Sequence, residues 1–140
     1  MAIPTSLALE IVTPDKAIVK EQVDEVQLPG SEGYLGVLPG HAPLVTTLQV
    51  GEMWYRKGQD TKYLALAFGF AEILPDRVIV LAQIAERAED IDLSRAEAAK
   101  VRAEQRVASV DSGVDFERAR IAMMKSLVRL QVATRARARA

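Results

Sequence analysis

Apolar and polar positions follow two different patterns along the 140-residue chain. In residues 1–85, short apolar or alternating runs are separated by turn residues such as Pro14 and Gly58, a pattern typical of antiparallel strands. In residues 86–140, apolar side chains instead recur every three or four positions, the period of an amphipathic helix. The expected strand segments are Leu7–Val12, Ala17–Val19, Val23–Leu28, Tyr34–Leu38, Leu44–Leu48, Glu52–Arg56, Lys62–Phe68, Phe70–Leu74 and Arg77–Ile84.

Two apolar stripes predict two helices in the second half of the chain. A short polar segment that ends at Asp115 separates them, so we expect an antiparallel hairpin with Asp115 as the cap of its second helix. The first stripe is mostly Ala and Val and buries little area, and we hypothesise that the hairpin can detach from the β domain. The stripes are Leu93, Ala96, Ala99, Ala103, Val107 and Val110, then Phe116, Ala119, Met123, Leu127 and Leu130.

Composition divides the chain at the same place. All six prolines and seven of the eight glycines lie before residue 76, whereas the remainder is rich in Ala, Glu and Arg. Residues 1–85 carry a net charge of −4 and residues 86–140 a net charge of +3. The sequence therefore predicts a β + α protein: an antiparallel β-sandwich or flattened barrel over residues 1–85, followed by a helical hairpin with a short basic tail over residues 86–140.

Several classes of function are excluded by composition. The net charge of −1 indicates no general attraction to nucleic acid. The chain has no cysteine and one histidine, His41, so disulfides, thiol catalysis and sites with several Cys or His metal ligands are excluded. No apolar run approaches the roughly 18 residues of a membrane span, and the first residues resemble no export signal. We expect an intracellular protein that meets a membrane only through partners.

The segment Glu32–Pro43 is unusually rich in glycine and proline. Its glycines suggest a phosphate-binding loop, but no Gly-Lys-Ser/Thr follows them. A catalytic role for its histidine would need a Ser or Cys nucleophile, and no such motif surrounds it. We favour a strand that leads into a rigid, exposed turn suited to docking. The candidate docking residues are Glu32, Tyr34, Leu38 and His41.

The junction between the two halves carries the other candidate chemistry. Asp92 precedes the first expected helix and is suited to cap it. Arg95 and Arg102 are seven positions apart and share one face of that helix, while Lys125 and Arg129 share a face of the second. If the hairpin joins these faces, four cations converge, and a nucleotide phosphate would balance them. The alternative is that both faces are simply solvated.

Three stretches resemble the epsilon subunit of bacterial F-type ATP synthases: Ile11–Pro14, Glu32–Pro43 and Ile91–Ala96. The resemblance implies a sandwich of about ten strands and a non-catalytic rotor subunit of the central stalk, which couples proton flow to ATP synthesis. It implies the gamma subunit and the c-ring of the membrane sector as partners, at the cytoplasmic face of the bacterial plasma membrane. It also implies a hairpin that extends into the alpha/beta catalytic head and inhibits ATP hydrolysis.

The same resemblance implies a regulatory ATP rather than a required cofactor. Some family members bind ATP through a motif of the form Ile/Leu-Asp-x-x-Arg-Ala together with basic residues on both helices. Lysine stands here at one position where the best binders carry arginine, and it lacks the planar two-pronged donor. The implied ATP residues are Glu86, Ile91, Asp92, Arg95, Ala96, Arg102, Lys125 and Arg129. The alternative function is a free-standing ATP-binding sensor.

Overall fold

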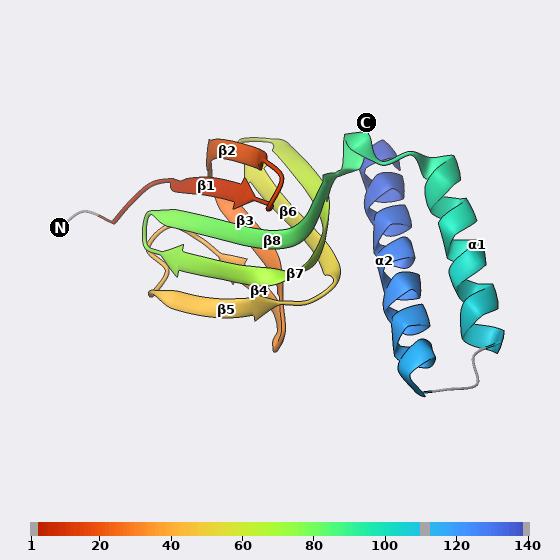
Figure 1. The fold of residues 1–140 in the computed structure, drawn as a ribbon. Helices are drawn as coiled ribbons and strands as arrows, with labels where there is room; N and C mark the ends of the chain where they lie inside the picture. Colours follow the sequence, from red (N-terminus) through yellow and green to blue (C-terminus); the bar gives the residue numbers. More distant parts are fainter. Residues whose placement is uncertain (1–2, 110–112, 139–140) are drawn as a thin grey trace.

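The computed structural model (Figure 1) describes residues 3–109 and 113–138. Eight strands come first and two helices follow, which confirms the predicted order of a β-sandwich and a helical hairpin. The elements are β1 (Leu7–Val12), β2 (Ala17–Val23), β3 (Glu25–Gly30), β4 (Gly33–Val37), β5 (Leu44–Leu48), β6 (Gly51–Lys57), β7 (Asp60–Leu74), β8 (Arg77–Arg87), the 3₁₀ turn η1 (Ala88–Asp90), α1 (Leu93–Ser109) and α2 (Gly113–Ala138).

The eight strands form one continuous sheet that folds around an apolar core. The strand order is β2-β1-β8-β7-β5-β3-β4, and β6 pairs with both β3 and β7. Neighbouring strands are antiparallel except β1 and β8, which are parallel. Alternate residues of β1 (Leu7, Leu9 and Ile11) are buried in the core, as the alternating pattern predicts.

Strand β7 joins two segments that the sequence pattern separates, Lys62–Phe68 and Phe70–Leu74. Phe68 and Gly69 have φ angles of 60° and 135°, which bend the strand without ending it. The pairing with β8 continues in one register across the bend, while the second neighbour changes from β6 to β5. The described residues therefore contain eight strands, where the resemblance implies about ten.

The position of Gly69 explains why the bend carries a glycine. A Cβ atom at this residue would lie 2.0 Å from the carbonyl oxygen of Leu81 on β8. The positive φ angle also disfavours any side chain there. Because of the bend, β7 pairs with β6 before it and with β5 after it, so a single strand connects these two parts of the sheet.

Helix α2 lies between the sandwich and α1 (Figure 1). It buries Ser126, Val132 and Ala133, whereas Phe116 and Leu127 of the predicted stripe are 43% and 40% exposed. The predicted stripe is wrong in part because α2 packs on two neighbours at once, so its buried surface is not one narrow band.

The beginning of α2 also differs from the expectation. The helix begins at Gly113, so Asp115 lies within its first turn and does not cap it. A carboxylate in the first turn still complements the positive end of the helix dipole. The stripe residue Val110 and most of the connecting segment lie outside the described residues.

Candidate functional site

A cleft opens where β8, α1 and α2 meet, and we call it the junction cleft. It has a volume of about 480 Å³. Its lining holds three carboxylates and three guanidinium groups, so it is balanced in charge rather than strongly cationic. The lining residues are Glu86, Asp90, Asp92, Arg95, Ala98, Ala99, Arg102 and Arg129.

Asp92 forms the N-terminal cap of α1. Its Oδ1 accepts a hydrogen bond from the backbone N–H of Arg95 at 3.1 Å, and its carbonyl accepts one from Ala96 at 2.9 Å. These contacts confirm the predicted cap. They also set the beginning of α1, and with it the face on which Arg95 and Arg102 reach the cleft.

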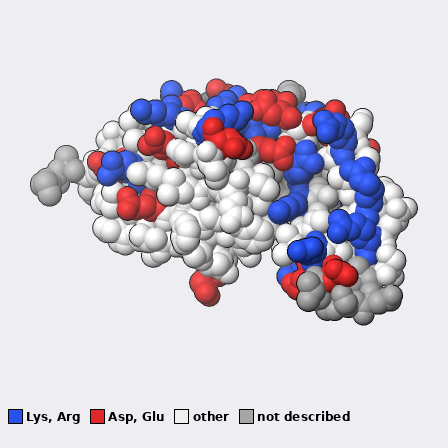
Figure 2. All heavy atoms as spheres, in the orientation of Figure 1, with Lys and Arg blue, Asp and Glu red and all other residues white. Residues whose placement is uncertain are grey.

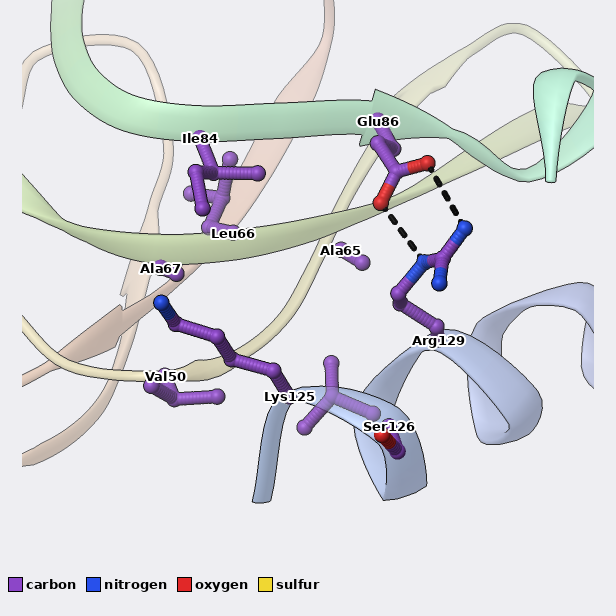
Figure 3. Close-up of a pocket in the computed structure, with 10 residues that line it drawn as sticks. Val50, Ala65, Leu66, Ala67, Ile84, Glu86, Lys125, Ser126 and Arg129 are labelled. Atoms are coloured by element: carbon purple, nitrogen blue, oxygen red, sulfur yellow. Dashed lines mark hydrogen bonds and ion pairs between the residues drawn. The ribbon is translucent and has the colours of Figure 1, made fainter. Parts of the chain in front are cut away.

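Arg129 of α2 is held by Glu86 of β8. The distance from Arg129 Nε to Glu86 Oε1 is 2.7 Å, and Arg129 Nη2 donates to Glu86 Oε2 at 3.3 Å (Figure 3). This two-pronged ion pair ties the helix to the sheet, and both side chains are about 30% exposed. In this state the charge of Arg129 is already balanced, whereas the described residues provide no ion-pair partner for Arg95 or Arg102.

Lys125 does not line the junction cleft. It lines a second hollow, of about 230 Å³, between α2 and the sheet, together with Arg129 and apolar residues such as Val50 and Ala67 (Figure 3). Its Nζ lies 5.8 Å from the centre of the Phe68 ring. Three of the four cations therefore line the junction cleft, while Lys125 lies with Arg129 on the side of α2 that faces the sandwich.

Ile91 and Ala96 are buried residues that pack against other apolar side chains. Their exposed fractions are 2% and 0%, and both belong to an apolar cluster that joins the sandwich to the hairpin. Ile91 follows η1 directly, and Ala96 lies in the first turns of α1. They are packed within this cluster and are not part of the lining of the junction cleft.

The candidate docking residues lie around β4, which is the last strand in the sheet order. Tyr34 and Leu38 are 56% and 54% exposed, and Glu32 is exposed in the turn before β4. His41 is half-buried, and its Nδ1 lies 2.6 Å from the carbonyl oxygen of Ala42. This contact holds the imidazole against the backbone of the turn. Tyr34 is tied to the sandwich because its hydroxyl accepts a hydrogen bond from the N–H of Glu52 at 3.3 Å.

The sequence analysis missed an exposed apolar face on β5, β7 and β8. Val45, Phe70 and Leu81 are 68%, 55% and 52% exposed, and Phe70 pairs directly with Leu81 across the sheet. Figure 2 shows a broad area without acidic or basic side chains over these strands. The signal was available in β7, where apolar residues occupy both the inward and the outward positions around the bend.

Among the described residues, no group of three or more acidic or histidine side chains could hold a metal ion. Neither α1 nor α2 combines the length and the apolar character needed to cross a bilayer.

Comparisons with known proteins cover both halves of the chain. The family model for the β-sandwich domain of the ATP synthase delta/epsilon chain matches residues 6–88, and that for its long α-helix domain matches residues 89–134. The ATP synthase epsilon chain of Nitratidesulfovibrio vulgaris is 50% identical over 127 residues, which is 91% of this chain and 95% of that protein. The corresponding protein of Koribacter versatilis is 61% identical over 98 residues, 70% of this chain and 69% of that protein.

Solved structures agree in fold. A chain in the mitochondrial ATP synthase of Euglena gracilis superposes with a TM-score of 0.82 at 24% identity, over 97% of this chain and 84% of that one. A chain in the central stalk and c-ring of the Tetrahymena thermophila enzyme gives 0.61 at 12% identity, over 96% and 98%. These likenesses show the fold, while the two family models and the sequence relatives show the family and confirm the resemblance. The chain belongs to the delta/epsilon family of ATP synthase subunits.

Proposed function

We propose that the chain is a non-catalytic central-stalk subunit of a proton-translocating F-type ATP synthase. The observation that carries this proposal is the family match, which runs through the sandwich and the hairpin alike. Its partners would be the gamma subunit, the c-ring and, when the hairpin extends, the alpha/beta head. The subunit would lie at the cytoplasmic face of the bacterial plasma membrane, held there by the complex.

The exposed apolar face supports a protein partner on the sandwich. Large exposed apolar patches mark interaction sites, and Val45, Phe70 and Leu81 lie together on three adjacent strands. We propose that this face packs on the gamma subunit and that the candidate docking residues around β4 contribute to contacts with gamma and the c-ring.

Co-purification tests the role in the complex. A tagged chain in its own host should bring down the gamma subunit and the catalytic subunits. Val45→Glu should abolish this, because a charge would be buried at the interface. Val101→Glu, at a 51% exposed position on α1, is the matched control and should leave it intact. A chain that binds ATP but never associates with synthase subunits would instead support the free-standing sensor.

We also propose that the junction cleft takes the phosphates of a regulatory ATP. Arg95 and Arg102 are the cations most available to an anion, since Arg129 is engaged by Glu86. The three carboxylates in the lining would limit the affinity. Because the cleft is built from both the sheet and the hairpin, ATP would favour the docked hairpin by its higher affinity for that state.

Calorimetric titration of the isolated chain with ATP tests this site. Saturable binding should be lost in Arg95→Ala and in Arg102→Ala. Arg106→Ala is the matched control, because Arg106 lies near the end of the same helix but is not part of the cleft lining. Absence of binding up to millimolar ATP would remove the nucleotide proposal and leave the role in the stalk unaffected.

A further inference from the structure

Glu52 is an unusual residue of the sandwich because its carboxylate is buried. Its exposed fraction is 4%, and it is the one acidic side chain among the buried residues that the structure describes. It lies on β6, beneath α2. An isolated buried carboxylate is strongly unfavourable, so its partners decide whether this position is tolerated.

Among the described residues, both partners of the Glu52 side chain come from α2. Gln131 Nε2 donates a hydrogen bond to Glu52 Oε2 at 2.8 Å, and Arg135 Nη1 lies 3.2 Å from Oε1 in an ion pair. Gln131 and Arg135 are one helical turn apart, so they reach the sheet from one face of the helix. Arg135 also lies 6.0 Å from the centre of the Tyr63 ring on β7. Oε1 is buried and accepts no hydrogen bond from the described residues, so its charge is balanced by the ion pair with Arg135 alone. The carboxylate therefore has these side-chain partners only while α2 is docked.

This arrangement acts on the position of α2 more than on overall stability. An ion pair between a buried carboxylate and a guanidinium group that is 44% exposed contributes little net stability, because solvent screens the attraction while the carboxylate is desolvated. When the hairpin leaves, Glu52 becomes hydrated and no penalty remains. When α2 docks in a shifted register, Glu52 is buried without Gln131 and Arg135, and the penalty is large.

We propose that Glu52, Gln131 and Arg135 form a latch that holds α2 on the sandwich in a single register and opens when the hairpin detaches. Two contacts flank it, the Arg129–Glu86 ion pair and a hydrogen bond from Arg137 Nη2 to the carbonyl oxygen of Ile91 at 3.2 Å. The latch is a property of the isolated chain. Its consequence for ATP hydrolysis rests on the proposed function.

The chain contains two convenient probes of docking. Trp54 is its sole tryptophan, lies on β6 and packs against the cluster that includes Val132. Its emission should shift to longer wavelength when α2 leaves. The chain has no cysteine, so Val132→Cys introduces a single thiol at a position that is 0% exposed while α2 is docked. The rate of thiol labelling then measures how often the helix leaves the sandwich.

The test compares Arg135→Ala and Gln131→Ala in the Val132→Cys background. The Arg135 side chain is 44% exposed, so solvent screens the pair, and leaving the buried Glu52 carboxylate without its cation should make Arg135→Ala label about fivefold faster. Arg120→Ala is the matched control, because Arg120 pairs with Glu117 on the exposed surface of the same helix. It should label at the original rate. Equal labelling rates in Arg135→Ala and Arg120→Ala would overturn the latch.

A double-mutant cycle separates the latch from a general loosening of the helix. Arg135→Ala should accelerate labelling because it leaves the Glu52 carboxylate buried without its cation. In the Glu52→Ala background the same substitution should scarcely change the rate, because no buried charge remains to be balanced. Multiplicative effects of the two substitutions would overturn the proposal. If the labelling results hold but the variants do not change ATP hydrolysis by the assembled synthase, the latch stands and the proposed regulation fails.

Discussion

The sandwich and the helical hairpin are held by different kinds of side chain. Among the described residues, the Leu, Ile and Met side chains that are at most 2% exposed all belong to the sandwich, except Ile91 at the junction, which is 2% exposed. The buried residues of α1 are two alanines, Ala96 and Ala103. Since apolar burial contributes about 0.8 kcal/mol per CH₂ group, the sandwich has a strong core and α1 a weak one. The position of the hairpin therefore depends more on individual polar contacts than the sandwich does.

The largest predicted effect lies in the sandwich core. Leu66 is 1% exposed in β7, and Leu66→Ala should lower the free energy of unfolding by about 2–5 kcal/mol through the cavity it leaves. Ala103→Gly in α1 should cost only about 1 kcal/mol, the difference in helix propensity. Urea unfolding followed by circular dichroism measures both. If Ala103→Gly lowered the free energy of unfolding as much as Leu66→Ala, the two regions would not differ in the strength of their cores.

A smaller effect is expected at the beginning of α1. Asp92→Ala removes the acceptor for the N–H of Arg95 and should destabilise the first turn by about 1 kcal/mol. Asp92→Asn keeps a capping oxygen and should retain most of this stability. Hydrogen exchange at the amides of Arg95 and Ala96 measures the difference, and the strands serve as an internal reference. Faster exchange in the strands as well would mean that the two regions are more tightly coupled than their cores suggest.

The smallest effect concerns the exposed pair of Glu117 and Arg120 on α2. The hydrogen bond from Arg120, followed by its charge, lowers the pKa of Glu117 below its ordinary value. A carboxyl group with a lowered pKa stabilises the folded state above its unfolded pKa, and this contribution is lost as the pH falls through the folded pKa. Arg120→Gln should return the pKa of Glu117 to its ordinary range in an NMR titration. An unchanged pKa would show that the pair does not persist in solution.

The elements of the sandwich could be predicted well from local pattern. Leu7–Val12 and Leu44–Leu48 are strands with the expected bounds, and the turn between β6 and β7 closes at the predicted Gly58, which has a φ angle of 61°. Alternation and turn residues are local signals, so they predict the strands without any knowledge of which strands pair with one another. The bend at Phe68–Gly69 was read as a strand end because a glycine gives the same local signal in both cases.

The candidate site was predicted less completely. The pattern predicts the cap at Asp92 and the shared helix face of Arg95 and Arg102, because these positions depend only on where α1 begins. Lys125 was misplaced relative to the others because its direction depends on how α2 is rotated against two neighbours. The burial of Glu52 gave no signal at all, since its partner Gln131 lies 79 residues away in the chain.

The amino-acid sequence alone indicates the order of the elements, the approximate positions of the strands and helices, the cap at Asp92 and, through its motifs, the family. These features follow from periodicity and short-range hydrogen bonding, which act within a few residues. Only the tertiary structure decided that β7 passes unbroken through its bend, that Arg129 pairs with Glu86 and that Glu52 is buried beneath α2. Each of these depends on which distant surfaces pack together, because burial and charge pairing are properties of the neighbourhood in space.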